Sequence, residues 1–211
     1  MKWRRMPLGP IGTNAYIISN QQKECLIIDP GSEPSKVFGY IKENQLKPIA
    51  ILLTHAHYDH IGAVDDVRDM YEIPVYIHKK EQSWLMDPAL NLSINLPFGE
   101  PIRLKPAEEI ISSEGLMSIG SFTFEIFETP GHSPGSISIY FKDENLVFSG
   151  DALFEGSIGR TDLPGGNYDV LMKSIHDKLL TLPEETLVLS GHGGETTIQQ
   201  EMDSNPFLNG F

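Results

Sequence analysis

The hydrophobic positions of the chain fall into short runs that are separated by polar segments. Eight runs rich in β-branched and aromatic residues predict strands at residues 15–19, 25–29, 50–54, 75–77, 122–128, 137–141, 146–149 and 186–190. Five segments with apolar residues three or four positions apart predict helices at residues 35–44, 62–71, 79–86, 168–180 and 196–204. Strands that alternate with helices in this way predict an α/β fold, in which helices cover the sheets.

The organisation of the chain is simple. It has no repeated motif, low-complexity tract or shift in composition, so residues 1–211 are expected to form a single domain. Residues 88–102 contain three prolines and two asparagines and predict a loop. This loop is either a mobile lid or a passive connection, and the sequence leaves both open.

Charge and composition exclude several classes of partner. The formal net charge is −13, from 16 basic and 29 acidic residues, and a field of that sign repels phosphate backbones. The single cysteine, Cys25, cannot form an internal disulfide, which fits a reducing compartment. The charged N-terminal residues are not followed by an apolar stretch, and no apolar run is long enough to cross a bilayer. We therefore expect a cytoplasmic protein that binds neither nucleic acid nor membrane.

The densest chemical signal comes directly after the predicted strand at 50–54. Four good metal ligands fall within six residues, in the run His55-Ala56-His57-Tyr58-Asp59-His60. Because side chains alternate in extended backbone, His55, His57 and Asp59 begin on one side, and a turn after Tyr58 would bring His60 to them. Imidazole and carboxylate together suit zinc, iron or manganese better than magnesium or calcium. A set of surface histidines is the alternative, and the ligand density argues against it.

Three further ligand-type residues each follow another apolar run. They are His132, Asp151 and His192, and a glycine precedes each of them. Sites in open α/β sheets gather outside the carboxyl ends of strands, and glycine permits the tight turns that such loops need. Seven ligands are enough for two metal ions with a position left for water.

These motifs resemble the metallo-β-lactamase superfamily, and the resemblance covers nearly the whole chain. Within the superfamily the chain is similar to a short bacterial branch of the glyoxalase II group. The marks of this branch are the segment 150–162, Gly150-Asp151-Ala152-Leu153-Phe154 running into Gly156-Ser157-Ile158-Gly159-Arg160-Thr161-Asp162, and the ending Asn205-Pro206-Phe207-Leu208. The resemblance implies a four-layer αββα sandwich.

The resemblance also implies a role for each ligand. His55, His57 and His132 would hold one divalent ion, Asp59, His60 and His192 would hold the second, and Asp151 would bridge them. The ions are expected to be zinc, with iron or manganese as alternatives. Asp29 would orient a ligand histidine, as such partners do; its alternative role is that of a turn-former before Pro30.

The expected reaction is hydrolysis of a thioester of a small thiol, such as S-lactoylglutathione. A hydroxide shared by two ions would attack the thioester carbonyl, and Asp59 would orient it as the catalytic residue. Arg160, nine positions after Asp151, would bind a carboxylate of the thiol carrier; its alternative is a structural pair with Asp162 or another acid. The resemblance gives an aromatic thiol contact at position 194, where this chain has glycine, so a broader and weaker thioesterase is expected.

Four alternative functions remain. A mononuclear-iron persulfide dioxygenase would hold its iron with His55, His132 and Asp151. A metal-dependent phosphodiesterase or nuclease would need a basic track, which the net charge disfavours. A β-lactamase proper would be expected to carry an export signal. A non-catalytic metal module would use closed sites that leave no water.

Some conspicuous residues are expected to have no catalytic role. His78 follows a strand but has no metal role in the family pattern, and His176 is expected on a helix face. Cys25 is expected to be a buried, inert thiol. The run Lys79-Lys80-Glu81 is expected to be the solvated start of a helix.

Overall fold

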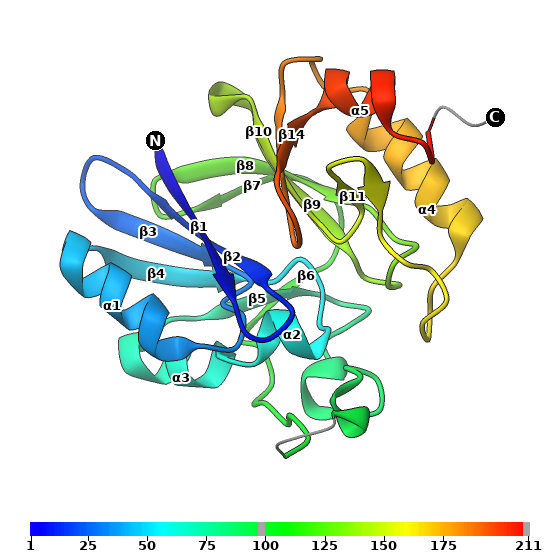
Figure 1. Ribbon diagram of the computed structural model, residues 1–211. Helices are drawn as coiled ribbons and strands as arrows, with labels where there is room; N and C mark the ends of the chain where they lie inside the picture. Colours follow the sequence, from blue (N-terminus) through cyan, green and yellow to red (C-terminus); the bar gives the residue numbers. More distant parts are fainter. Residues whose placement is uncertain (97–99, 209–211) are drawn as a thin grey trace. The chain divides into compact units, whose positions relative to one another are not determined.

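A computed structural model describes residues 1–96 and 100–208. The chain divides into two compact units, Met1–Ser112 and Ser113–Phe211, which we describe in turn (Figure 1). The expectation of a single domain over residues 1–211 stays a prediction. No helix in the two described ranges is long and apolar enough to cross a membrane.

The first unit is built on a six-stranded mixed sheet. Its strands lie in chain order: β1 (Lys2–Leu8), β2 (Thr13–Ser19), β3 (Glu24–Ile28), β4 (Lys47–Leu52), β5 (Val75–His78) and β6 (Glu109–Ile111). The first three strands pair antiparallel, and β3 to β6 pair parallel. Parallel neighbours need crossovers, which α1 (Pro34–Asn44) and the pair α2 (Tyr58–Ile61) and α3 (Val64–Tyr71) supply.

The core of the first unit lies between this sheet and its helices. Buried Val37 and Ile41 on α1 and Val64 and Val67 on α3 pack with the apolar side chains of the strands. These residues are three or four positions apart, so each helix turns one apolar face to the sheet. The carboxyl ends of β3, β4 and β5 are thereby held at one edge of the sheet.

The second unit is built on another six-stranded sheet. In spatial order its strands are β14 (Glu195–Thr197), β13 (Leu187–Ser190), β10 (Leu146–Gly150), β9 (Ile137–Phe141), β8 (Phe122–Glu128) and β7 (Gly115–Ile119). All neighbours are antiparallel except β10 and β13, which are parallel. The connection between these two parallel strands contains α4 (Tyr168–Ser174), which continues into the π-helical turn η4 (Ile175–Leu179).

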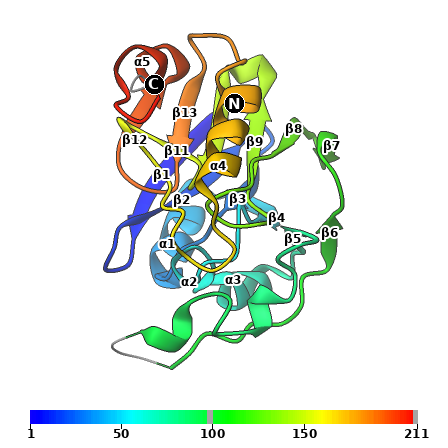
Figure 2. The same ribbon diagram turned by 90° about the vertical axis from the view of Figure 1, so that its right-hand side faces the viewer.

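A short hairpin leaves the second sheet directly after β10. It consists of β11 (Leu153–Phe154) and β12 (Ser157–Ile158), and it lies beside α4 (Figure 1, Figure 2). Leu153 and Ile158 pack there with Leu171 and Ile175. The last helix of the unit, α5 (Ile198–Ser204), contributes Ile198 to the same cluster.

Most of the predicted elements are confirmed, and one is wrong. All eight predicted strands are present, and the predicted helices at 35–44, 168–180 and 196–204 match α1, α4 with η4, and α5. The helix predicted at 62–71 is shorter and follows the separate turn α2. The helix predicted at 79–86 is instead a series of turns that ends in the 3-10 helix η1 (Trp84–Met86). The polar and short strands β1, β6, β7, β11, β12 and β14 were not predicted.

The side chain of Asn91 anchors the loop predicted at 88–102 by two hydrogen bonds. It contains the 3-10 helix η2 (Ser93–Asn95), while residues 97–99 lie outside the described part of the chain. The buried amide of Asn91 donates to the carbonyls of Trp84 and Ile102, both at 3.0 Å. Whether the loop acts as a lid stays a prediction.

Candidate metal centre

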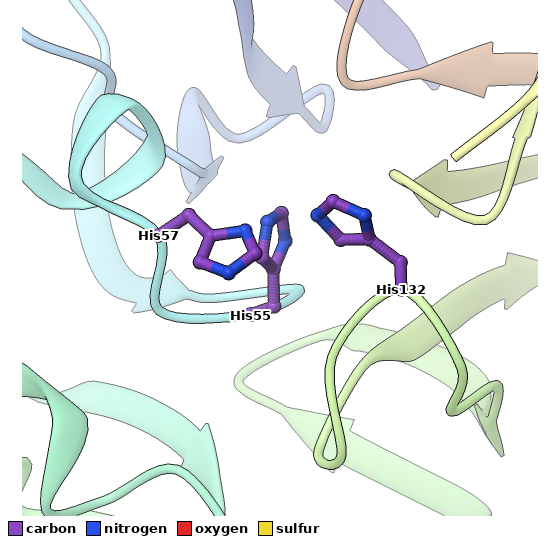
Figure 3. A group of neighbouring side chains, drawn as sticks. All are labelled: His55, His57 and His132. Carbon is purple, nitrogen blue, oxygen red and sulfur yellow. The ribbon is translucent and has the colours of Figure 1, made fainter. Parts of the chain in front are cut away.

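Four predicted ligands of the first unit lie in the loop and short helix that follow β4. His55, His57, Asp59 and His60 are all buried. The ring centroids of His55 and His57 are 4.6 Å apart, and those of His55 and His60 are 4.1 Å apart. Figure 3 shows His55 and His57 rising from this loop, with their rings close together. Alternation along the run brings His55 and His57 together, and the helical turn α2 brings His60 to them.

Asp29, at the end of β3, fixes the orientation of this loop. One carboxylate oxygen accepts from the Thr54 amide at 2.8 Å, and the other accepts from Thr54 Oγ1 at 2.6 Å and from His60 Nδ1 at 2.9 Å. The Asp29 backbone has a φ of 46°, in the left-handed region that aspartate adopts more readily than most residues other than glycine. The contact with His60 Nδ1 is the one that the role implied by the resemblance requires, and that role stays a prediction.

The same contacts assign the tautomers of two histidines. The Thr54 hydroxyl donates its only hydrogen to Asp29, so at 3.1 Å from His55 Nδ1 its oxygen accepts a hydrogen bond from the Nδ1–H of His55. His60 likewise donates its Nδ1 proton to Asp29. In both imidazoles Nε2 then carries a lone pair, which is the form that binds a metal ion.

The carboxylate of Asp59 is held by a residue that the sequence did not single out. Thr13 Oγ1, at the start of β2, donates to Asp59 Oδ2 at 2.6 Å. The same Oδ2 lies 3.3 Å from His60 Nε2. Thr13 is separated from Asp59 by 46 positions, and no local signal marks it as part of the site.

Glu81 corrects the expectation that residues 79–81 are a solvated helix start. The Glu81 side chain is fully buried, and its Oε2 accepts from the Ala56 amide at 2.7 Å. Ala56 stands between His55 and His57, so this bond holds the backbone of the ligand loop. A buried carboxylate is costly unless it is hydrogen-bonded, and the Ala56 amide offsets part of that cost.

The three predicted ligands of the second unit follow the carboxyl ends of β8, β10 and β13. Asp151 lies between the two histidines of this group: its Oδ2 is 3.5 Å from His132 Nε2 and 3.4 Å from His192 Nε2. The parallel pairing of β10 and β13 explains the closeness of Asp151 and His192, since the Gly191 amide donates to the Gly150 carbonyl at 2.8 Å. His132 lies in the loop after β8 (Figure 3).

Two glycines make the position of His132 feasible. Gly131 has a φ of 129°, and a Cβ there would lie 2.3 Å from the Leu171 amide nitrogen. Gly159 passes so close to Asp151 that a Cβ would lie 1.8 Å from the Asp151 carbonyl oxygen. This approach lets the Arg160 carbonyl accept from His132 Nδ1 at 2.8 Å, so His132 also presents the lone pair of Nε2.

The distances within each unit suit a divalent ion. In a tetrahedral site with imidazole and carboxylate ligands at about 2.0–2.1 Å, neighbouring donor atoms are about 3.3 Å apart. The three observed separations between a carboxylate oxygen and an imidazole Nε2 are 3.3, 3.4 and 3.5 Å. A charge-assisted hydrogen bond between such groups would be shorter, about 2.7–2.9 Å. The donor sets therefore fit metal ligation better than ion pairing.

Arg160 forms the structural pair that was its alternative role. Its Nε and one terminal nitrogen donate to the two oxygens of Asp162 at 2.8 and 2.7 Å. The hydrogen bond from Arg160 lowers the pKa of Asp162 to about 2, and the same bond raises the pKa of Arg160. Both side chains are more than half exposed, so the guanidinium remains within reach of solvent.

Two of the residues that were set aside earlier, Cys25 and His176, lie where the sequence predicted. Cys25 is buried in β3, and burial raises the pKa of its thiol to about 12, so it is protonated and inert at neutral pH. His176 is exposed in η4, on a helix as expected, and the expectation that neither it nor His78 has a metal role stays a prediction.

Comparison with known proteins places the chain in a family. The sequence profile of the metallo-beta-lactamase superfamily matches residues 8–192, which span both units. A Bacillus subtilis relative called "Probable metallo-hydrolase YqgX" is 60% identical over 100% of this chain and 99% of its own length. The Haemophilus influenzae hydroxyacylglutathione hydrolase GloC is 36% identical over 97% of this chain and 96% of its own.

Solved structures agree with this assignment. The crystal structure of the BLEG-1 B3 metallo-beta-lactamase matches with a TM-score of 0.96 and 57% identity, over 99% of this chain and 100% of that one. A di-iron-bound form of TTHA1623 matches with a TM-score of 0.87 and 39% identity, over 97% and 100%. The predicted fold is thus confirmed, and the chain belongs to the metallo-β-lactamase superfamily and is a metallohydrolase.

Proposed function

We propose that this metallohydrolase cleaves thioesters of a small thiol with the help of two divalent metal ions. The observation that carries the metal part is the set of carboxylate–imidazole separations of 3.3 to 3.5 Å, with Nδ1 of His60 and His132 already bonded to an acceptor. The thioester part is supported by the 36% identity to GloC, whose name describes a hydrolase of hydroxyacylglutathione, which is a thioester.

The proposed ligand sets follow the family pattern residue by residue. His55, His57 and His132 would hold one ion, Asp59, His60 and His192 the other, and Asp151 would contact both. We propose zinc, although a relative at 39% identity binds two irons. Bound ions of this kind polarise a carbonyl and lower the pKa of water toward about 7.

The chain's own residues prepare the site for this chemistry. Asp29 and Thr54 accept hydrogen bonds from Nδ1 of His60 and His55, so the Nε2 atoms of these histidines are left to bind a metal ion. Thr13 orients the carboxylate of Asp59. Asp59 is the residue we expect to accept a hydrogen bond from the attacking water. A thiol has a pKa of about 8.5 and leaves as a thiolate, so thioester cleavage asks for no separate acid.

The experiment that tests the proposal is a panel of thioesters that varies the acyl group and the thiol separately. Metal content is measured on the same sample, and a β-lactam and a glutathione persulfide are included. We expect turnover of several thioesters by protein that holds about two metal ions. Oxygen consumption with the persulfide by protein holding one iron would instead indicate the dioxygenase, and absence of thioester turnover by fully loaded protein would contradict the proposal.

Hydrolysis of a β-lactam is a second candidate, because the solved relative at 57% identity is titled a B3 metallo-beta-lactamase. A β-lactam is also an acyl compound, and the same attack on a carbonyl would open its ring. Its leaving group is an amide nitrogen, which must gain a proton, so it makes a greater demand on the site than a thiolate does. The kcat/KM values of the β-lactam and the best thioester, measured on one preparation, decide between the two.

A prediction about Arg160 concerns the thiol carrier. Arg160→Ala is expected to raise KM for carboxylate-bearing thioesters and to leave kcat nearly unchanged, because a contact made equally in ground and transition states appears in KM. In the parent protein the Asp162 carboxylate competes with the substrate carboxylate for the Arg160 guanidinium. Asp162→Asn weakens this competition and should lower KM for the same substrates. Since the pKa of Asp162 is about 2, the pair persists at every pH above about 4, and neither effect should vary between pH 6 and 9. Unchanged KM values in both variants would contradict a role for Arg160 in binding.

A further inference from the structure

A buried carboxylate in the C-terminal helix is unexplained by the ligand sets. Glu201, on α5, is fully buried, although no lysine or arginine is among its hydrogen-bond donors. Its Oε1 accepts from Thr196 Oγ1 at 2.6 Å, and its Oε2 accepts from the Gly156 backbone amide at 2.9 Å and from the side-chain Nδ2 of Asn205 at 2.7 Å. Burial of an ionised group costs free energy, which these three donors offset.

One of these contacts, and a further hydrogen bond from Asn205, reach the β11–β12 hairpin. Gly156 is in the two-residue turn, with a φ of 64°. Asn205 bonds to the next residue as well, since its Nδ2 donates to the Ser157 carbonyl at 3.1 Å. The Asn205 side chain is itself oriented by the Phe207 amide, which donates to Oδ1 at 2.9 Å. We call Glu201 and Asn205 the hairpin clamp.

The hairpin and the residues directly before and after it are connected to all three predicted ligands of the second unit. Asp151 is the residue from which the chain enters β11, and the Phe154 ring meets the His192 ring edge-on at 6.0 Å. After β12 the chain passes Gly159, whose amide donates to the Ala152 carbonyl at 3.2 Å. The next carbonyl, of Arg160, accepts from His132 Nδ1 at 2.8 Å.

We propose that Glu201 and Asn205 are positioning residues for the metal centre, acting through the β11–β12 hairpin. Their hydrogen bonds fix the position of the hairpin turn. The position of the hairpin in turn fixes the Arg160 carbonyl, which orients His132, and the Phe154 ring, which orients His192. This inference rests on the proposed metal centre but not on the thioester substrate. It also gives a physical role to the ending Asn205-Pro206-Phe207-Leu208, which the ligand pattern leaves without one.

The test compares Asn205→Ala with Ser204→Ala in the full-length protein. Ser204 lies on the same helix and donates only to the Gln200 carbonyl, at 2.7 Å, so its variant loses an α5 hydrogen bond without touching the hairpin. Metal affinity is measured by competition with a chelator, and the Co(II)-loaded proteins are compared by absorption spectroscopy. Asn205→Ala is expected to lower metal affinity by about tenfold and to change the Co(II) spectrum, as loss of an outer partner of a ligand does. Ser204→Ala should change neither.

Two more variants keep the test decisive. Glu201→Gln preserves shape and can still accept from Gly156 and Asn205, so it should retain most of the affinity and the parent spectrum. If Asn205→Ala does not fold, Thr196→Val removes one donor to Glu201 with little change in volume and should shift the spectrum in the same direction. Variants that lose thermal stability but keep the parent affinity and Co(II) spectrum would overturn the inference. Failure of every thioester in the panel, with these metal readouts still shifted, would refute the substrate proposal and leave the clamp intact.

Discussion

Asp151→Asn is expected to leave a folded chain that binds metal poorly and has little activity. The carboxylate oxygen of Asp151 lies 3.4 to 3.5 Å from the Nε2 atoms of two histidines, and the family pattern gives this residue contact with both ions. Asparagine keeps the shape but loses the charge that would neutralise two cations. Changes to outer partners of ligands cost about 10–100-fold in affinity or activity, so a direct ligand should exceed the upper end of that range. Metal analysis after dialysis and kcat on the best thioester measure the effect.

His78→Ala is the matched control for this experiment. His78 is also a buried residue at the end of a strand, in β5, but we assign it no ligand role. The variant should keep both metal and turnover rate, at some cost in stability. Loss of metal from His78→Ala would show that a ligand has been overlooked, and near-native stoichiometry and rate in Asp151→Asn would refute the assignment of Asp151.

The strands and the ligand loops could be predicted because their signals are local. A run such as Ile137–Phe141 is buried along its whole length, and its apolar residues mark it directly. The ligand-type residues after β4, β8, β10 and β13 each follow such a run, so strand ends and chemistry coincide in the sequence. The pattern of apolar runs and the residues directly after them therefore predicts both the strands and the candidate ligands.

The residues that hold the ligands could not be predicted, because their contacts join distant parts of the chain. Thr13 and Glu81 are 46 and 25 positions from the residues they bond. Arg160 orients His132 through its backbone carbonyl, which no side-chain pattern reveals. The charged run at 79–81 has the composition of a solvated helix start, and only the burial of Glu81 in the fold shows otherwise.

The strand β1 was missed for a related reason. Its sequence Lys-Trp-Arg-Arg-Met-Pro-Leu has three cationic residues, and its burial alternates only weakly. An edge strand is paired on one side alone and often carries charge, which prevents association with other edges. Its hydrogen bonds to β2 determine its conformation, and they are formed only after the turn at residues 9–12 brings the two segments together.

Gly159→Ala is expected to damage the metal centre. A Cβ at this position would lie 1.8 Å from the Asp151 carbonyl oxygen and 3.2 Å from His132 Cβ. The first contact is to backbone, which cannot rotate away, so the hairpin must move relative to Asp151 and carry the Arg160 carbonyl away from His132. Overpacking typically costs about 1–3 kcal/mol of stability, and the displaced carbonyl should lower metal affinity by at least about tenfold.

Gly39→Ala separates this effect from a general response to added methyl groups. Gly39 lies within α1, and nothing is within 4 Å of a Cβ there, so alanine should favour the helix by about 0.5–1 kcal/mol. For a chain of this size that gain raises Tm by about 1–4 °C, with metal content unchanged. Gly159→Ala should instead lower Tm and lose metal at chelator concentrations that the Gly39 variant withstands. Parent-like metal affinity in Gly159→Ala would mean that the hairpin can shift without disturbing His132, and it would remove the geometric basis for the role of the Arg160 carbonyl.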